Sequence, residues 1–260
     1  MRTMGAKPTC ALASASSALP SSPGETVSPG LSIATTHTQA RYVLPSILCR
    51  FRELHPHLPI HLRQGDSGQI PDLIARCEAH MAIASGSDPA FASMLRVPCF
   101  RWRRVIVTPE DHPLAYVNQP TLAQLAAYPL ITYTPSTRRV SSLMAAFHRE
   151  GLQPELAVTA SDTGVLKAYI RKGMGVGILA DLAIDGEEDA DLRVRNATHL
   201  FEPLTTWAGL SRGLHPDSTF DLVAMLAPHL GPQGAAQLRQ CASQADIDRL
   251  VLPHRLPFRR

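Results

Sequence analysis

Residues 31–42, which read LSIATTHTQARY, decide the fold that this sequence predicts. An apolar strand beginning at Leu31 runs into a hydroxyl-rich turn, and the turn opens a helix. The carboxyl end of a strand that leads into a helix presents free backbone N–H groups and the positive end of the helix dipole. Thr36, Thr38 and Gln39 add neutral side-chain donors at the same place. The stretch therefore predicts a pocket for a small anion, built without a cation.

Strand-like and helix-like segments alternate along the chain from residue 31 onward, which is typical of an α/β protein with largely parallel sheets. The helix from Thr38 to Leu54 should be kinked near its start by Pro45. Further helices are expected over residues 161–171 and 217–229. The expected strands are 31–36, 59–64, 81–85, 94–99, 104–109, 129–133, 156–160, 175–180 and 206–211.

The two ends of the chain differ in amino-acid composition from the middle. Residues 1–30 are rich in Ser, Ala, Pro and Thr, which bury too little apolar surface to offset the entropy of ordering, so we expect this segment to be disordered. Residues 231–260 contain one possible helix around 235–245 and a Pro- and Arg-rich end. We expect this second segment to be a loose tail.

The composition is that of a globular protein: 45% of the 260 residues are hydrophobic, 18% are charged, and the net charge is +3. The basic residues are spread along the chain, so they do not indicate nucleic-acid binding by this chain alone. The run from Arg101 to Arg104 is better explained as a solvated hinge or subunit surface. No apolar run approaches the roughly 20 residues that span a bilayer, and residues 1–30 lack the apolar segment of a secretory signal. We expect a cytoplasmic location and no membrane partner.

The sequence offers no motif for covalent chemistry. The histidines form neither H-E-x-x-H nor a triad-like pattern, so we expect no enzyme activity, no cofactor and no metal site. The five cysteines lack C-x-x-C spacing and are expected to be free buried thiols. Residues 173–177, GMGVG, superficially match a dinucleotide-binding loop. They precede a strand, however, whereas that loop follows a strand and opens a helix.

Several further strings accompany residues 31–42, in a fixed order and spacing: Gln64-Gly65, MAIAS at 81–85, VTPEDHPL at 107–114, YPLITYT at 128–134, TASD at 159–162 and GMGVGI at 173–178. Together they closely resemble the effector-binding domain of LysR-type transcriptional regulators, and specifically the CysB/Cbl group, which senses sulfur status. The resemblance covers about residues 31–230.

The resemblance implies an α/β fold of two Rossmann-like subdomains joined by two crossover strands, similar to a type 2 periplasmic binding protein. Subdomain I would comprise residues 31–98 and 208–230, and subdomain II would comprise residues 99–207. The crossovers would fall near Val97–Arg103 and Pro203–Gly209, with Trp102 and Trp207 as hinge residues. The ligand would lie in the cleft between the subdomains.

The resemblance also assigns site residues. Thr36, Thr38 and Gln39 match the family's first ligand-contacting turn, and Ser85 stands where the group commonly has threonine. Two alternatives remain for the loop after Tyr133: either Thr137 replaces the family's threonine after a one-residue shift, or Arg138 faces the cleft. Helix capping is the competing explanation for Thr36, Thr38 and, more strongly, Asp162. The complete set of expected ligand-binding residues is Thr36, Thr38, Gln39, Ser85, Thr137, Arg138, Ser161 and Asp162.

The resemblance implies an effector-sensing domain of a regulator of sulfur assimilation and cysteine biosynthesis. Its ligand would be sulfate, thiosulfate, O-acetylserine or N-acetylserine, and its output a population shift between open and closed forms. A homodimer is expected through the 38–54 helix, the 60–64 strand and the 217–229 helix. Family members carry a winged helix–turn–helix ahead of this domain, and residues 1–30 cannot form one, so DNA is expected as a partner only if that domain is present. The alternative is a small-anion binding protein without DNA-binding output.

Overall fold

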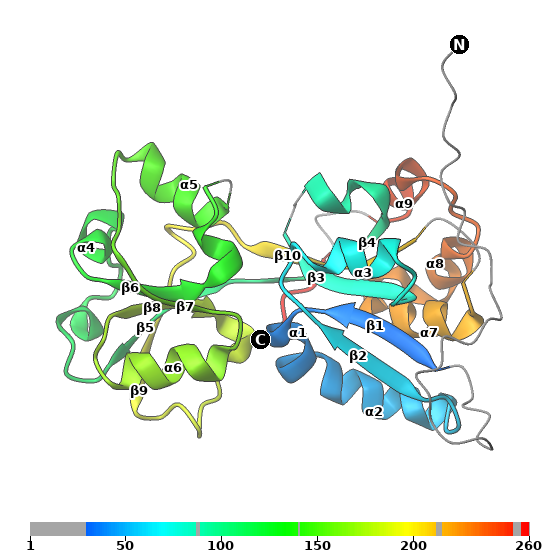
Figure 1. The fold of residues 1–260 in the computed structure, drawn as a ribbon, viewed down its shortest axis with the longest axis horizontal. Helices are drawn as coiled ribbons and strands as arrows, with labels where there is room; N and C mark the ends of the chain where they lie inside the picture. The colour runs from blue at the N-terminus through cyan, green and yellow to red at the C-terminus, as the bar shows by residue number, and fades with distance from the viewer. Residues whose placement is uncertain (1–29, 87–88, 140, 212–214, 252–255, 260) are drawn as a thin grey trace, which may run out of the picture.

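The chain folds around two five-stranded sheets that lie end to end in the computed structural model (Figure 1). The structure describes residues 30–86, 89–139, 141–211, 215–251 and 256–259. The expectation of disorder for residues 1–30 concerns residues that, apart from Gly30, lie outside these ranges. Two α/β halves joined by extended strands are the predicted fold class, which is therefore confirmed.

The first sheet has the order β2-β1-β3-β10-β4. Strand β1 pairs in parallel with β2 and β3, whereas β10 runs antiparallel to both β3 and β4. Every residue of β1 except Ser32 is buried, because helices cover both faces of the sheet at this point. The strand bounds are β1 Leu31–Thr35, β2 Ile60–Gln64, β3 Met81–Ser85, β4 Leu95–Trp102 and β10 Leu204–Leu210.

The second sheet repeats this plan with the order β7-β6-β8-β5-β9. Strand β6 is parallel to β7 and β8, and β5 is antiparallel to β8 and β9. Strand β9 was not expected from the sequence, since LRVRN alternates charged and apolar residues over too short a stretch to stand out. The bounds are β5 Arg104–Pro109, β6 Leu130–Tyr133, β7 Leu156–Ala160, β8 Val176–Ala180 and β9 Leu192–Asn196.

The predicted helix over residues 38–54 is two helices, which meet at Val43. Pro45 lies in the first turn of the second one, where its missing N–H group costs no hydrogen bond. The first-sheet helices are α1 His37–Tyr42, α2 Leu44–Leu54, α3 Ile70–Ala75, α7 Asp217–Leu226, α8 Gly231–Leu238 and α9 Gln244–Leu250. The second-sheet helices are α4 Leu122–Ala126, α5 Ser142–Arg149 and α6 Thr163–Arg171.

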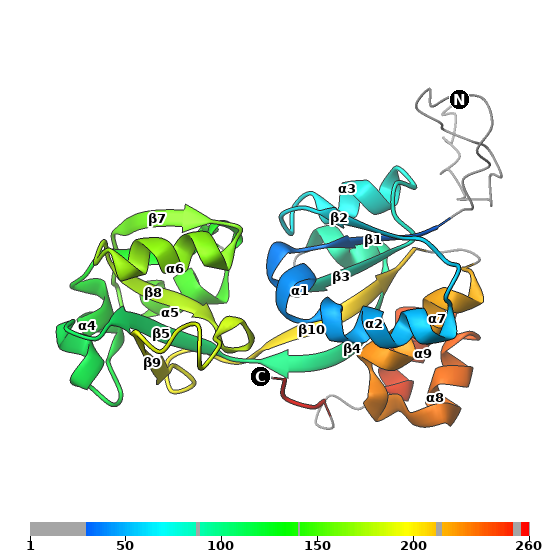
Figure 2. The same ribbon diagram turned by 90° about the horizontal axis from the view of Figure 1, so that it is seen from below.

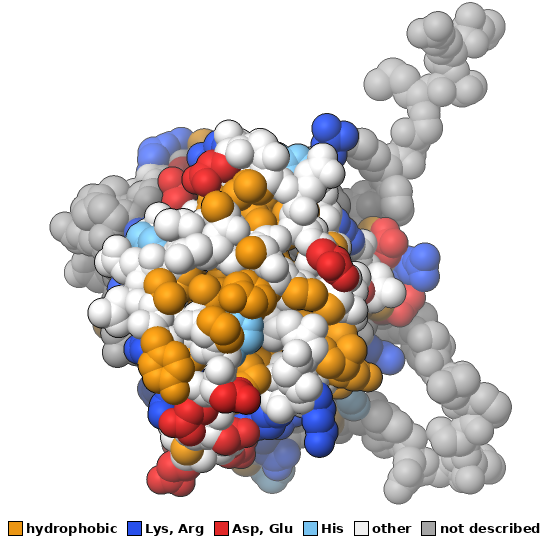
Figure 3. All heavy atoms as spheres, turned by 90° about the vertical axis from the view of Figure 1, so that its left-hand side faces the viewer, with side chains coloured by type: hydrophobic (Ala, Val, Ile, Leu, Met, Phe, Trp, Pro, Cys, Tyr) orange, Lys and Arg blue, Asp and Glu red, His pale blue; other side chains and the backbone are white. Residues whose placement is uncertain are grey.

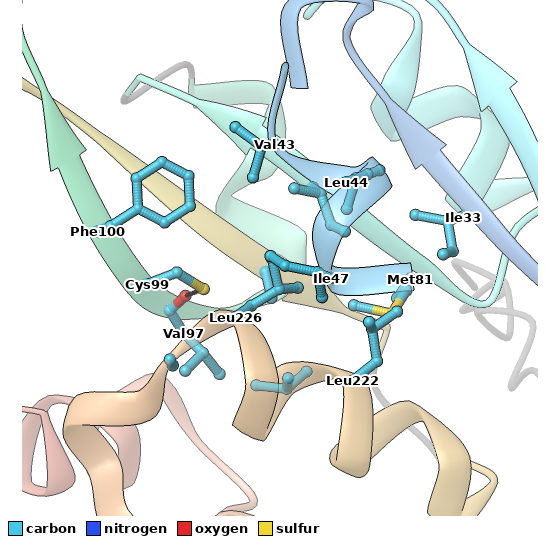
Figure 4. Close-up of a cluster of buried hydrophobic side chains, with 14 of the residues drawn as sticks. Ile33, Val43, Leu44, Ile47, Met81, Val97, Cys99, Phe100, Leu222 and Leu226 are labelled. Atoms are coloured by element: carbon cyan, nitrogen blue, oxygen red, sulfur yellow. Dashed lines mark hydrogen bonds between the residues drawn. The ribbon is translucent and has the colours of Figure 1, made fainter. Parts of the chain in front are cut away.

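The main core lies between the first sheet and helices α2 and α7. Ile47 from α2 and Leu222 and Leu226 from α7 point toward one another below the strands in Figure 4. Phe91 and Trp207 pack edge to face on another cluster, with ring centroids 4.5 Å apart. The second sheet has cores of its own, so each half buries its own apolar surface.

Two of the three glycines of GMGVG, Gly173 and Gly175, form the α6–β8 turn, and Gly177 lies inside β8. Gly173 follows the C-terminal end of α6 with φ of +70°, a left-handed conformation that costs glycine nothing. A Cβ atom at Gly175 would stand 2.3 Å from the carbonyl oxygen of Pro129, so only glycine fits where this backbone approaches β6. Both glycines precede β8, as the sequence analysis expected.

The chain passes between the sheets twice, and the two passages run side by side (Figures 1 and 2). Only Arg103 separates β4 from β5, and the return passage leads from β9 into β10. Leu204, the first residue of β10, pairs with Trp102, the last residue of β4. Trp102 thus adjoins the crossing, whereas Trp207 lies inside β10. The subdomain boundaries given above remain predictions.

The prediction of a loose tail after residue 230 is wrong for the part that the structure describes. Helix α9 packs against strand β4 and helix α8 packs against α7 and α9, and Leu238 and Ile247 are buried in the main core. Gln244 exchanges two hydrogen bonds with the backbone of Arg96 on the edge strand β4. Sequence reasoning missed this packing because the apolar residues are few and sit in two short helices.

The cysteines also depart from expectation. Cys99 is free and buried, and burial raises the pKa of its thiol to about 12. Cys49 is free but exposed, and Cys77 is disulfide-bonded. Spacing along the sequence does not reveal which thiols come within reach of one another in the folded chain.

Ile247→Ala should lower the free energy of unfolding by about 2–5 kcal/mol, because the substitution leaves a cavity at a fully buried position. Urea unfolding followed by circular dichroism would measure the change. The neighbouring exposed residue provides the control: Asp248→Ala should change stability by less than about 0.5 kcal/mol. An unchanged Ile247→Ala variant would contradict the packing of α9 on the sheet.

Candidate functional site

A cavity of about 660 Å³ lies between the two sheets, at the ends of their parallel strands. This volume falls within the usual range of small-molecule sites. Most of the residues that line the cavity have polar side chains, and they come from both halves of the molecule. Its lining residues include Thr36, Thr38, Gln39, Ser85, Trp102, Arg104, Tyr133, Arg138, Ser142 and Ser161.

Strand β1 and helix α1 supply the first wall. Thr36 is the N-cap residue of α1, yet its side chain makes no capping hydrogen bond. The Thr36 hydroxyl therefore does not cap the helix, although helix capping was the main competing explanation for this residue. Thr36, His37, Thr38 and Gln39 all line the cavity.

A buried polar network forms the floor below Gln39. Gln39 is only 1% exposed, and its Nε2 donates to Ser85 Oγ and Thr206 Oγ1, both at 3.2 Å. The two hydroxyls lie 2.7 Å apart, and Trp102 Nε1 donates to Ser85 Oγ at 3.0 Å. Gln39 Oε1 is buried and has no hydrogen-bond partner among the described residues. The network fixes the side chains of α1, β3, β4 and β10 relative to one another.

Tyr133 joins the two walls. Its hydroxyl lies 3.0 Å from Thr163 Oγ1, accepts from the backbone N–H of Ala180 at 3.2 Å, and is hydrogen-bonded to the side chain of Thr38. Burial raises the pKa of the Tyr133 phenol above its ordinary value. The hydroxyl stays protonated at neutral pH and links α1 of the first half to β6, β8 and α6 of the second.

Arg104 places a positive charge in the second wall. Its side chain extends from the first residue of β5 and is 5% exposed. Nη2 donates to Ser142 Oγ at 3.0 Å, and the guanidinium lies 5.6 Å from the ring centroid of Phe201. Nη1 is buried and without a partner in the described part of the chain. Burial lowers the pKa of Arg104 to about 10, so the group is still charged at neutral pH.

The mouth of the cavity is bridged by contacts between the halves. Ser161 Oγ donates a short hydrogen bond to Asp66 Oδ1, which joins the loop after β2 to the start of α6. Beside it, Arg41 Nη1 lies 4.0 Å from Asp162 Oδ2. Both side chains of this pair are well exposed, so the pair contributes little to stability.

The structure brings most of the expected site residues together, and leaves some apart. Thr36, Thr38, Gln39, Ser85, Arg138, Ser161 and Trp102 line the cavity. Asp162 instead caps α6, accepting from Val165 N at 3.1 Å. Thr137 Oγ1 donates to the carbonyl of Thr134 at 2.8 Å, and Trp207 Nε1 donates to the carbonyl of Gly86. These three residues are not among those that line the cavity.

Sequence reasoning missed four members of the site: Arg104, Tyr133, Thr206 and Asp66. Arg104 was placed in a solvated basic run, and its burial corrects that expectation. The available signal was its position at the head of the apolar strand 104–109, where the side chains alternate between two buried faces. Thr206 and Asp66 carry no signal of their own, because their partners lie 95 residues or more away along the chain.

The remaining chemistry is limited. Within the described ranges, no group of three or more His, Cys, Asp or Glu side chains is arranged to hold a metal ion. No helix among the described residues has both the length and the apolar character needed to cross a bilayer. The outer end of the second half, shown in Figure 3, carries hydrophobic side chains in its middle and charged side chains toward its edges. The cavity between the sheets is the place where polar groups from both halves converge.

Tyr133→Phe should cost about 1–3 kcal/mol of stability at neutral pH, because Ala180 N and Thr163 lose a buried partner. Above the ordinary tyrosine value of 10.0, the unfolded chain releases a proton that the folded chain retains, so the wild type loses part of its stability there. Urea unfolding at neutral and alkaline pH should show the difference between the two proteins narrowing. Tyr116→Phe, at a position that is 75% exposed, should match the wild type at both. A constant difference would contradict the raised pKa.

Comparison with known proteins places this architecture in a family. Residues 24–230 match the family model described as the LysR substrate binding domain. The chain is 39% identical over 201 residues to the transcriptional regulator CysB of Haemophilus influenzae, covering 77% of this chain and 62% of that protein. It is likewise 39% identical over 186 residues to the regulator cbl of Escherichia coli K12, covering 70% and 58% respectively.

Solved structures agree with this placement. The cofactor-binding domain of the Cbl transcriptional regulator superposes with a TM-score of 0.72 at 34% identity, covering 91% of this chain and 99% of that one. The effector-binding domain of QuiR in complex with shikimate shares the fold, with a TM-score of 0.66 at 16% identity. The matched segment spans 58–62% of the length of the two regulators above. The chain belongs to the LysR family of transcriptional regulators and carries the family's substrate-binding domain, with CysB and Cbl among its relatives.

Proposed function

We propose that the cavity binds a small anionic effector of sulfur metabolism: sulfate, thiosulfate, O-acetylserine or N-acetylserine. One observation carries the proposal: hydroxyl groups from both halves and the amide of Gln39 converge on a cavity whose most deeply buried charge is a guanidinium. Hydroxyl, N–H and guanidinium donors together suit an oxyanion. The similarity to CysB and Cbl supports a sulfur-related ligand over other small anions.

The proposed mechanism is a population shift between two arrangements of the halves. The cavity walls belong to different sheets, and the backbone connects those sheets at two neighbouring passages. A ligand that contacts both walls binds the closed arrangement more tightly than an open one, and this difference in affinity shifts the equilibrium. The Asp66–Ser161 and Thr38–Tyr133 hydrogen bonds between the halves are the contacts that such a movement would make and break.

The output of the domain is also part of the proposal. The relatives are transcriptional regulators, which favours regulation over catalysis. Because the match covers less than two thirds of CysB and of Cbl, DNA binding by a protein containing this domain depends on a helix–turn–helix outside the matched segment. An anion-binding protein without regulatory output is the alternative, and the association state described below bears on it.

The double substitution Thr36→Ala with Thr38→Ala should abolish binding of sulfate and of N-acetylserine while the fold is kept, because Thr36 makes no capping hydrogen bond. Calorimetry measures binding, and thermal unfolding shows whether the wild type is stabilised by the ligand. Thr198→Ala, at an exposed turn, is the matched control and should bind as the wild type does. Absence of both binding heat and thermal stabilisation at millimolar concentrations of these ligands would refute the anion-binding function.

We further expect a symmetric dimer that uses α2, β2 and α7 of the first half. The exposed apolar residues of this surface include Leu54 and Leu62. Leu62→Asp should give a folded monomer, because a charge at the interface would be buried without a partner. Leu156→Asp offers a close control, since Leu156 is also 38% exposed and also lies on an edge strand, but in the second sheet. Light scattering that shows a wild-type monomer at micromolar concentration would contradict the dimer.

A further inference from the structure

We propose that Arg104 is the residue that determines ligand class: it binds an acidic group of an organic anion, such as the carboxylate of an acylated amino acid. The inference deepens the proposed function and rests on it. It selects organic acids over bare inorganic oxyanions among the candidate effectors. Its basis is a buried charge that the protein leaves without a counter-charge at the wall of the cavity.

The environment of Arg104 is unusual for a buried cation. Its only side-chain hydrogen bond in the described structure goes to Ser142, a neutral hydroxyl. No carboxylate of the described residues lies within 4.0 Å of its guanidinium, although Asp66 and Glu202 also line the cavity. Asp66 is hydrogen-bonded to Ser161 instead. Arg104 therefore carries a charge that is desolvated and not neutralised.

Burying such a charge is costly, because burial removes its hydration and only the Ser142 hydroxyl and the Phe201 ring replace part of it. The depressed pKa of the guanidinium reflects the same desolvation. A ligand carboxylate in the cavity would supply both the counter-charge and an acceptor for the buried Nη1 atom, which lacks one. Arginine binds carboxylates and similar planar anions through paired N–H donors. The partner that Arg104 lacks is therefore a carboxylate or a similar planar anion.

Gln39, in the wall formed by the first half, requires a second functional group on the ligand. Gln39 Oε1 is buried without a partner, because the Nε2 atom of the same amide serves the hydroxyls of Ser85 and Thr206. A ligand hydroxyl or amide N–H would satisfy it, whereas sulfate and thiosulfate have no proton to donate at neutral pH. Arg104, on β5 of the second half, needs an acceptor, and Gln39, on α1 of the first half, needs a donor. A ligand that serves both has at least two different polar groups.

The size of the cavity agrees with a ligand of this kind. A volume of about 660 Å³ accommodates an organic molecule that extends from one wall to the other. A compact inorganic ion would occupy a small part of this volume. N-acetylserine combines a carboxylate with a hydroxyl and an amide N–H, so it has the required set of groups.

The experiment measures binding of three probes by calorimetry: N-acetyl-L-serine, its neutral carboxamide, and inorganic sulfate. Wild-type protein should bind the acid more tightly than the carboxamide. Arg104→Gln should weaken binding of the acid roughly ten- to a hundredfold, as expected for the loss of a charge-assisted hydrogen bond, and leave binding of the carboxamide nearly unchanged. This coupling between one side chain and one ligand group distinguishes recognition from a general structural effect.

Arg103→Gln is the matched control. Arg103 is the adjacent arginine, but its guanidinium lies 4.1 Å from the ring centroid of Phe258 and the residue does not line the cavity. Its replacement should leave the affinity for all three probes as in the wild type. Arg104→Lys retains the charge without the paired donors, and should bind the acid with an affinity between those of the wild type and Arg104→Gln. The lysine variant also serves as the test if the glutamine variant does not fold.

The contrary outcomes are separable. Equal weakening of the acid and the carboxamide by Arg104→Gln, or no weakening of either, would overturn the assignment to Arg104 while anion sensing stands. Wild-type protein that binds sulfate but neither organic probe would overturn the inference of an organic ligand and support the proposed function in its inorganic form. Failure of the wild type to bind any of the three probes would overturn both.

Discussion

The direct passage of β4 into β5 is the constraint on which the rest of the structure depends. Trp102 ends one strand and Arg104 begins the next, yet the two strands belong to different sheets. Both side chains reach the same cavity, where Trp102 donates to Ser85 of the first half and Arg104 donates to Ser142 of the second. The cavity therefore stands beside the covalent connection between the halves, where a change in their relative orientation alters its walls directly.

The polar groups of the site are arranged so that most of them satisfy one another. Hydroxyl and amide dipoles can be buried at modest cost when they are hydrogen-bonded, and Gln39, Ser85 and Thr206 form such a set. Tyr133 links the two halves in the same way, through hydrogen bonds to Thr163 and Ala180 in the second half and to Thr38 in the first. Against this background the unpaired atoms of Arg104 and Gln39 stand out, because they lie on opposite walls of one cavity. A buried polar atom without a partner lowers the stability of the protein, and a ligand that supplies the partner is favoured.

The elements that sequence reasoning recovered are those with strong local signals. The strands at 31–35, 81–85 and 176–180 are nearly continuous apolar runs bounded by turn residues, and the structure places strands there. Strand β9 and helices α8 and α9 were missed or undervalued, since their local pattern is weak and their stability comes from packing on residues distant in sequence. The same distinction between strong and weak local signals applies to the residues of the site. Thr36, Thr38 and Gln39 share one turn and could be predicted as a group. The capping hydrogen bond of Asp162 is the competing explanation that the sequence offered, whereas the local hydrogen bond of Thr137 was not expected.

The sequence by itself determined the order of the strongly patterned strands and helices, the glycine-rich turn into β8 and the hydroxyl-rich turn into α1, because each depends on residues within a few positions of one another. The tertiary structure decided which polar groups face each other across the cavity and which charge is buried there. Arg104 looks like part of a solvated basic run along the chain, and it becomes a buried cation only when β5 is covered by helices and Phe201 approaches its guanidinium. Burial and pairing depend on contacts between segments distant in sequence, which local patterns do not encode.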